Sequence, residues 1–185
     1  MKSIAWLTLA LAAAVVSGSF AAEPAKQNSE DEGKLLQALS AQKLTMREAI
    51  KKVLEGTKDI PIAARFALDD KGELMLRVLA TEKGFATDVD HAGIKLYRTY
   101  VDAAKWKPET KAVNAEHLMR ASECWTLMAV SRDSLDDILE RAEKDHHNII
   151  YAIGPGIRDG KAEFILSVDS DGKMGEARYD LRARK

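Results

Sequence analysis

The chain has 185 residues, of which 46% are hydrophobic and 31% are charged, and its formal net charge is −1 at pH 7. So balanced a charge argues against nucleic acid or an anionic membrane surface as the partner, because both attract strongly basic proteins. The single cysteine has no second thiol for an internal disulfide, so an apolar core must hold the fold together.

The N-terminus has the features of a secretory signal peptide, which we assign to residues 1–22. A short positive segment, Met1-Lys2, precedes an almost wholly apolar run at 4–16, and small residues lead to Ala22. This run is shorter than the roughly 20 residues of a membrane-spanning helix, and its small-residue end favours cleavage. We therefore predict a periplasmic or secreted protein with no membrane anchor after signal cleavage.

Two short segments precede the first regular pattern. Residues 23–33 are polar and acidic, which predicts a flexible leader, and a short helix is expected at 34–41. A longer helix should begin after Thr45, because Thr45 and Glu48 have the spacing of a capping box. Its apolar side chains recur at intervals of three and four residues and give it one buried face: Met46, Ala49, Ile50, Val53 and Leu54.

After Pro61 the hydrophobic period changes from that of a helix to that of a strand. Two alternating segments flank a turn-forming sequence at 69–72, so we expect a hairpin, and another strand is expected at 94–101. The helix and the hairpin can bury their apolar faces against each other. The inward set on the hairpin is Ile62, Ala64, Phe66, Leu68, Leu74, Leu76, Val78 and Ala80.

The same plan returns about 89 residues downstream. Ser134 and Asp137 replace Thr45 and Glu48 in a second capping box. A strand is expected at 148–153, where the sequence Gly154-Pro155-Gly156 should end it, and an alternating strand should follow the turn at 159–160. A last alternating strand is expected at 176–183. The apolar stripe of the helix is repeated by Leu135, Ile138, Leu139 and Ala142, and upstream of it Cys124, Trp125 and Met128 align with Leu35, Leu36 and Leu39.

These patterns predict an α+β fold of two tandem repeats, each a helix packed on a small antiparallel β-sheet. The first unit is expected at 34–104, a linker containing Pro108 at 105–113, and the second unit at 114–185. A helix should begin at 114, whereas 124–130 fits either a helix or a strand. Cys124 aligns with a core position, so we expect it to be buried as a small hydrophobic residue.

Candidate catalytic and metal-binding motifs fail on spacing. Residues 169–172 begin like a calcium loop, but Lys173 stands where the next ligand belongs, so a hairpin turn is expected. The adjacent His146 and His147 would point in different directions from a regular backbone, and the other histidines lack a zinc-ligand pattern. We therefore expect no metal, no cofactor and no enzymatic activity.

Helix, hairpin and further strand after a signal peptide resemble the PepSY domain, found in propeptides of secreted metalloproteases and in small bacterial envelope proteins. The resemblance rests on 45–50, on 64–78 around Asp70-Lys71-Gly72, and on 100–103, with a second copy at 134–138 and 159–161. It implies a cystatin-like fold and a noncatalytic exported binding protein, a protease-inhibitory or modulatory module that acts in trans on a protease or envelope protein. The alternative is a periplasmic sensor or carrier with a small-ligand site between the two repeats.

A partner site is predicted on the outer face of the first hairpin. A helix covers one face of such a sheet and leaves the other for water or a partner. That other face carries Arg65, Met75, Arg77 and Leu79, and an apolar surface rimmed by arginine is typical of an interaction site. In the alternative interpretation, residues 85–113 or the second unit cover this face as ordinary core.

Overall fold

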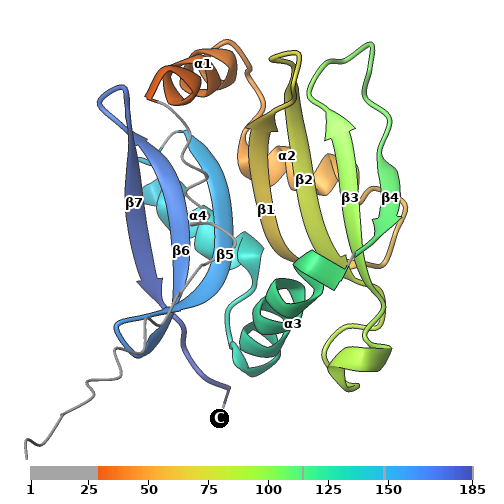
Figure 1. Cartoon of the computed structure of the whole chain (residues 1–185). Helices are drawn as coiled ribbons and strands as arrows, with labels where there is room; N and C mark the ends of the chain where they lie inside the picture. Colours follow the sequence, from red (N-terminus) through yellow and green to blue (C-terminus); the bar gives the residue numbers. More distant parts are fainter. Residues whose placement is uncertain (1–28, 114, 148, 185) are drawn as a thin grey trace, which may run out of the picture.

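A computed structural model describes residues 29–113, 115–147 and 149–184. In this part of the chain four α-helices flank one seven-stranded sheet (Figure 1). The predicted signal peptide and the first residues of the predicted leader lie outside the described residues. The α+β class expected from the sequence is confirmed.

The chain order of the elements alternates helix pairs with runs of strands. The helices are α1 (Ser29–Ser40), α2 (Met46–Val53), α3 (Ala115–Val130) and α4 (Leu135–Lys144). The strands are β1 (Ile60–Leu68), β2 (Leu74–Thr81), β3 (Ile94–Tyr100), β4 (Glu109–Ala112), β5 (Ile150–Arg158), β6 (Lys161–Ser170) and β7 (Lys173–Asp180), and a short 3-10 helix, η1 (Val89–His91), precedes β3.

All strand pairs are antiparallel, and the strand order is β4-β3-β2-β1-β5-β6-β7. The first strands of the two halves, β1 and β5, therefore meet at the centre, where Ala64 pairs with Ile153 and Arg65 with Ala152. The two halves share one continuous sheet, where the sequence predicted a small separate sheet for each. This difference arises because β1 and β5 each have a free edge that satisfies its backbone groups by pairing.

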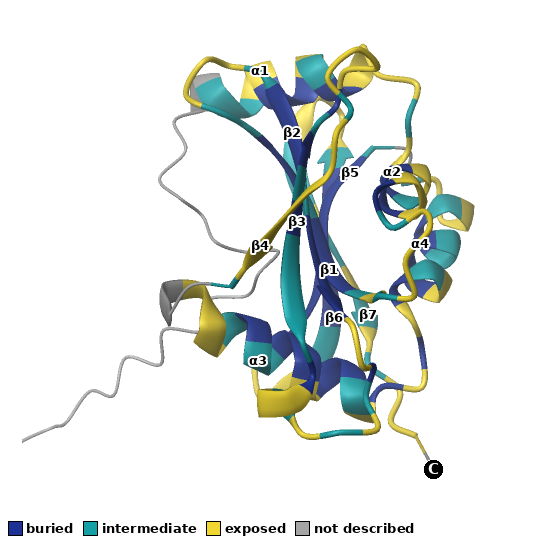
Figure 2. Cartoon of the chain, turned by 90° about the vertical axis from the view of Figure 1, so that its right-hand side faces the viewer, coloured by how far each residue is buried: buried dark blue, intermediate teal, exposed yellow. Residues whose placement is uncertain are grey.

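Helices α2 and α4 lie side by side on one face of the sheet (Figure 2). Both begin with the predicted capping boxes, in which Thr45 and Ser134 accept hydrogen bonds from the backbone N–H groups of Glu48 and Asp137. Each helix buries its predicted apolar stripe: Met46, Ala49, Ile50 and Val53 on α2, and Leu135, Ile138, Leu139 and Ala142 on α4.

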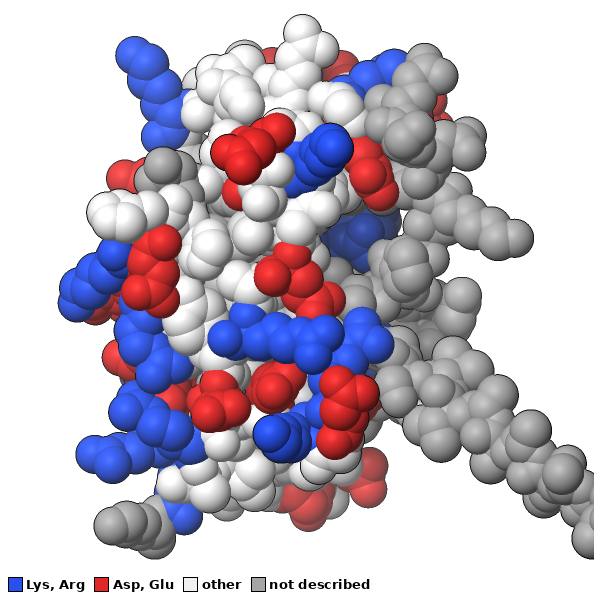
Figure 3. Space-filling view, turned by 90° about the vertical axis from the view of Figure 1, so that its left-hand side faces the viewer, with Lys and Arg blue, Asp and Glu red and all other residues white. Residues whose placement is uncertain are grey.

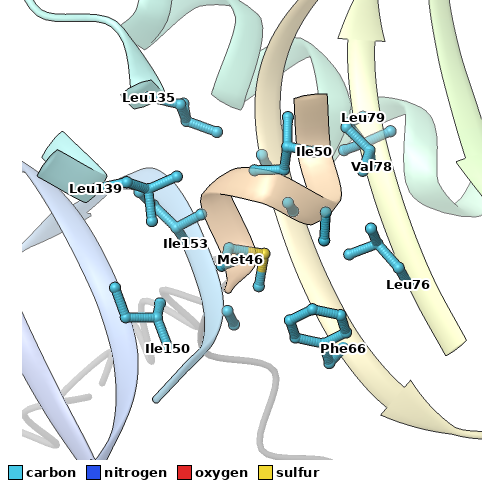
Figure 4. Close-up of a cluster of buried hydrophobic side chains, with 14 of the residues drawn as sticks. Met46, Ile50, Phe66, Leu76, Val78, Leu79, Leu135, Leu139, Ile150 and Ile153 are labelled. Carbon is cyan, nitrogen blue, oxygen red and sulfur yellow. The ribbon is translucent and has the colours of Figure 1, made fainter. Parts of the chain in front are cut away.

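The main core lies between these two helices and the middle strands of the sheet. Figure 4 shows Ile50 of α2 and Leu139 of α4 in one cluster with Phe66, Leu76 and Ile153 from three strands. Side chains from both halves therefore build a single core. Either half alone would leave part of this apolar surface in contact with water.

Helices α1 and α3 lie toward opposite ends of the strands, on the side away from α2 and α4 (Figure 2). The residues predicted to be equivalent in them are all buried: Leu35, Leu36 and Leu39 in α1, and Cys124, Trp125 and Met128 in α3. Residues 124–130, for which helix and strand were both open, continue α3. Burial raises the pKa of the Cys124 thiol to about 12, in agreement with its predicted place in the core.

Four predicted boundaries were wrong. The strand expected to end at Ile153, before the Gly154-Pro155-Gly156 sequence, continues through that sequence to Arg158 as β5. Residues 29–33, expected in the flexible leader, are the start of α1. The expected linker at 105–113 contains β4, which pairs with β3 at the edge of the sheet. The last strand runs from Lys173, directly after the turn, to Asp180, whereas it was expected at 176–183. The predicted turn at 169–172 is present, and Gly172 N–H donates to the Asp169 carboxylate at 2.8 Å.

We predict that Ile50→Ala and Leu139→Ala each lower the free energy of unfolding by about 2–5 kcal/mol, because each leaves a cavity in the shared core. Urea unfolding followed by circular dichroism measures this loss. Met119→Ala is the control, because Met119 is 83% exposed, and it should change stability by less than about 0.5 kcal/mol. Core variants as stable as the control would contradict the shared core.

Candidate functional site

The predicted partner face is not an exposed apolar surface. Met75 is 5% and Leu79 is 2% exposed within the chain, so their prediction as partner-binding residues was wrong. The middle strands are buried on both faces, because α2 and α4 cover one side and α1 and α3 lie on the other (Figure 2). The interpretation of this face as ordinary core therefore holds for its apolar residues.

The two arginines of the predicted site lie next to each other on that face and are half-buried. Arg65 of β1 is directly opposite Arg77 of β2, and Arg77 is directly opposite Arg98 of β3. Directly paired residues of an antiparallel sheet point to the same face. We call these three residues the arginine row. The sequence analysis did not identify Arg98 as a site residue. The alternation of residues along the strand at 94–101, once this strand is paired with the hairpin, was the only signal that could have placed Arg98 on this face.

The arginine row occupies the middle of a longer line of paired residues across all seven strands. Arg98 is opposite Glu109 of the edge strand β4, and Arg65 is opposite Ala152 of β5. The line continues through Ser167 of β6 to Glu176 of β7. Like charges directly opposite each other on neighbouring strands destabilise a sheet. Along this line of paired positions the acidic residues stand at the two ends, and the three arginines are neighbours in the middle.

The β7 edge of the same sheet has a different charge pattern. There Arg178 lies 2.6 Å from Glu176, 3.6 Å from Asp159 and 3.9 Å from Glu163. Figure 3, which faces this edge, shows basic and acidic side chains intermingled over its surface. On the other half of the sheet, three arginines occupy directly paired positions on neighbouring strands.

A hollow of about 310 Å³ adjoins the arginine row at Arg98. The end of β3, the edge strand β4 and the segment between them form its walls. We call it the basic pocket, because one arginine and three lysines among its lining residues face a single glutamate. Its lining residues are Met75, Arg98, Thr99, Tyr100, Lys105, Lys107, Glu109 and Lys111.

A second candidate site lies between α2 and α4. The Arg47 guanidinium donates to both Asp136 carboxylate oxygens, at 2.7 and 2.9 Å, and lies 3.4 Å from Glu140 and 3.5 Å from Glu143. Beside this ion-pair cluster is a hollow of about 230 Å³. Its lining is mainly apolar: Arg47, Ile50, Lys51, Leu54, Pro61, Leu135, Asp136 and Leu139.

Neither site contains a recognisable catalytic arrangement of side chains. Within residues 29–113, 115–147 and 149–184, no group of three or more His, Cys, Asp or Glu side chains is placed to hold a metal ion. The helices of these same ranges include none that is long and apolar enough to cross a membrane. What both sites offer chemically is charge and shape for binding.

No protein-family model and no curated protein sequence matches the chain. Among solved structures, the chain is similar to a protein described as a putative lipoprotein from Clostridium difficile 630. The sequence identity is 15% and the TM-score 0.34, and the match covers 78% of this chain and 91% of that chain. So low a TM-score carries no inference about fold or function, and the function is inferred from the site itself.

We predict a loss of stability in acid that depends on Asp136. The hydrogen bond from Arg47 lowers the pKa of Asp136 from 3.8 to about 2. A carboxyl group whose pKa is lower in the folded state stabilises the fold above its unfolded pKa, and this contribution disappears as the pH falls from about 4 to 2. The effect should be modest, because the Asp136 side chain is 45% exposed.

Urea unfolding between pH 5 and 2 tests this contribution. Asp136→Asn should flatten the decline in stability over this range. The control Asp171→Asn, in the exposed β6–β7 turn, should retain the decline of the unmodified protein. An equal decline in Asp136→Asn and the unmodified protein would show that the Arg47–Asp136 pair does not stabilise the fold.

Proposed function

We propose that this protein is a noncatalytic exported binding protein that holds an acidic protein partner on the arginine row. The observation that carries the proposal is the direct opposition of Arg65, Arg77 and Arg98 on three neighbouring strands. Like charges directly opposite each other on neighbouring strands repel, so we infer that this arrangement costs folding stability. Carboxylates of an acidic partner would weaken this repulsion and so contribute binding energy.

The chemistry of arginine suits this role. A guanidinium presents several N–H donors in one plane and binds a carboxylate through two parallel hydrogen bonds. Neighbouring strands lie about 4.8 Å apart, so the row can engage carboxylates at similar spacing. Since the three side chains are half-buried, part of their water shell is already removed before a partner arrives. The partner we propose is a protease or another envelope protein, whose activity this protein inhibits or modulates.

We further infer that the chain arose by duplication of one PepSY-like unit. Arg47 and Asp136 are 89 positions apart and bind each other directly, and Ala64 and Ile153, with the same separation, pair at the centre of the sheet. Direct contact between equivalent positions is characteristic of an axis of two-fold symmetry. The register shift of β1 at Pro61–Ala63 has its counterpart in β5 at Ile150–Ala152. These observations support two equivalent halves around such an axis.

The alternative function is a sensor or carrier for a small ligand bound between the two repeats. The hollow between α2 and α4 favours it, because its lining comes from both halves. We rank this alternative second. At about 230 Å³ the hollow is smaller than the typical ligand pocket of about 300–1,000 Å³.

A comparative pull-down from the cell envelope of the producing organism tests the proposed function. The baits are the exported protein, its Arg65→Gln/Arg77→Gln variant, and a control Arg132→Gln/Arg178→Gln variant that removes the same charge elsewhere. A hydrogen bond to a charged group contributes about 1.5–3 kcal/mol, so loss of two arginines should weaken capture by about tenfold or more. Quantitative mass spectrometry measures the partner retained by each bait.

We expect the row variant to lose the partner and the control variant to retain it. The thermal unfolding midpoint of the row variant should equal or exceed that of the unmodified protein, because the change removes repulsion, and the midpoint of the control variant should stay close to it. Raising the salt concentration should weaken capture by the unmodified protein, because salt screens the ion pairs. Equal capture by the row variant and the control would overturn the proposal.

A further inference from the structure

We propose that the basic pocket is a separate binding site for a small polyanion, a molecule with two or more phosphate or carboxylate groups. This site goes beyond the proposed protein-binding function, because it shares only Arg98 with the arginine row and can be tested without the partner. The volume of about 310 Å³ matches the lower end of ligand pockets. A small molecule therefore fits this pocket better than the surface of a protein partner does.

The walls of the pocket are held in place by the fold. The segment after β3 turns tightly, since the Ala104 N–H donates to the Asp102 carboxylate at 2.8 Å. Further along, the Lys107 N–H donates to the Thr99 hydroxyl at 3.1 Å, which ties the segment to the buried end of β3. Trp106 is half-buried, and the Lys52 ammonium lies 4.2 Å from the centre of its ring. These contacts fix the backbone of the pocket walls before an anion binds, so the entropy lost on binding is mainly that of the lysine side chains.

The charges of the pocket differ in how far they are already neutralised. Lys105 forms an ion pair with Glu73 and lies near the Tyr100 ring. The side chains of Arg98, Lys107 and Lys111 form no hydrogen bond or ion pair with any residue in the described part of the chain. Three cations are therefore positioned around one hollow and are available to an anion.

Uncharged residues also line the pocket. Met75 and Thr99 are buried, and Tyr100 is half-buried. Tyr100 is fixed by its hydroxyl, which donates to the Asp69 carboxylate at 3.1 Å. A compact anion can lie in this pocket with its phosphate or carboxylate oxygens toward the lining cations. Because three such cations line one hollow, an anion with two or more charged groups is expected.

Isothermal titration calorimetry on the exported protein tests the site, with pyrophosphate in one arm and citrate in the other. We expect saturable binding of one molecule per chain for at least one anion, and the arm that binds identifies phosphate or carboxylate as the preferred group. The Lys107→Gln/Lys111→Gln variant should bind about tenfold more weakly or worse, since each charged hydrogen bond contributes strongly.

The control is Lys161→Gln/Lys173→Gln, which removes two exposed lysines at the ends of β6 and β7. This variant has the same net charge as the pocket variant and should bind within about twofold of the unmodified protein. Absence of saturable binding in both arms, or equal weakening in the two variants, would overturn the proposal. The outcome is independent of the arginine row, because neither variant changes Arg65 or Arg77.

Discussion

The pairing of β1 with β5 at the centre of the sheet is the contact on which the rest of the structure depends. It brings Ala64 next to Ile153 and Arg65 next to Ala152, and thereby joins two halves that are distant in the sequence. The central strands β1, β2 and β5 carry buried apolar residues on both faces, so both faces need cover. This requirement explains why α2 and α4 share one face and why α1 and α3 are needed on the other (Figure 1).

The features predicted correctly are those that depend only on residues close together in the sequence. The capping boxes at Thr45 and Ser134, the helix stripes and the hairpin turns each depend on residues that are close in the sequence. The β1–β5 pairing could not be predicted in this way, because no local pattern specifies which distant edge a strand will meet. Strand β4 was missed for another reason: all four of its residues are exposed, so it shows no hydrophobic alternation.

The site was predicted in part. Placing Arg65 and Arg77 on one face followed from strand alternation and was correct. Met75, Leu79, Ala63 and Ala67 are all buried on the face of the central strands that carries the arginine row, and this burial is the reason why they are apolar. An apolar residue on the outer face of a hairpin can indicate either a partner or another layer of the same chain, and the sequence of one hairpin does not distinguish them.

The central claim is that the fold maintains the arginine row at a cost in stability, and a double-mutant cycle on Arg77 and Arg98 tests it most directly. Urea unfolding of Arg77→Gln, Arg98→Gln and the double variant at low salt gives their coupling. Each single substitution already removes the whole Arg77–Arg98 repulsion, so the sum of the two single effects counts this gain twice. The double variant should therefore be less stable than that sum predicts, by about 0.2–1 kcal/mol. This difference should shrink at high salt. A coupling of zero, or one in which the two arginines stabilise each other, would contradict the account.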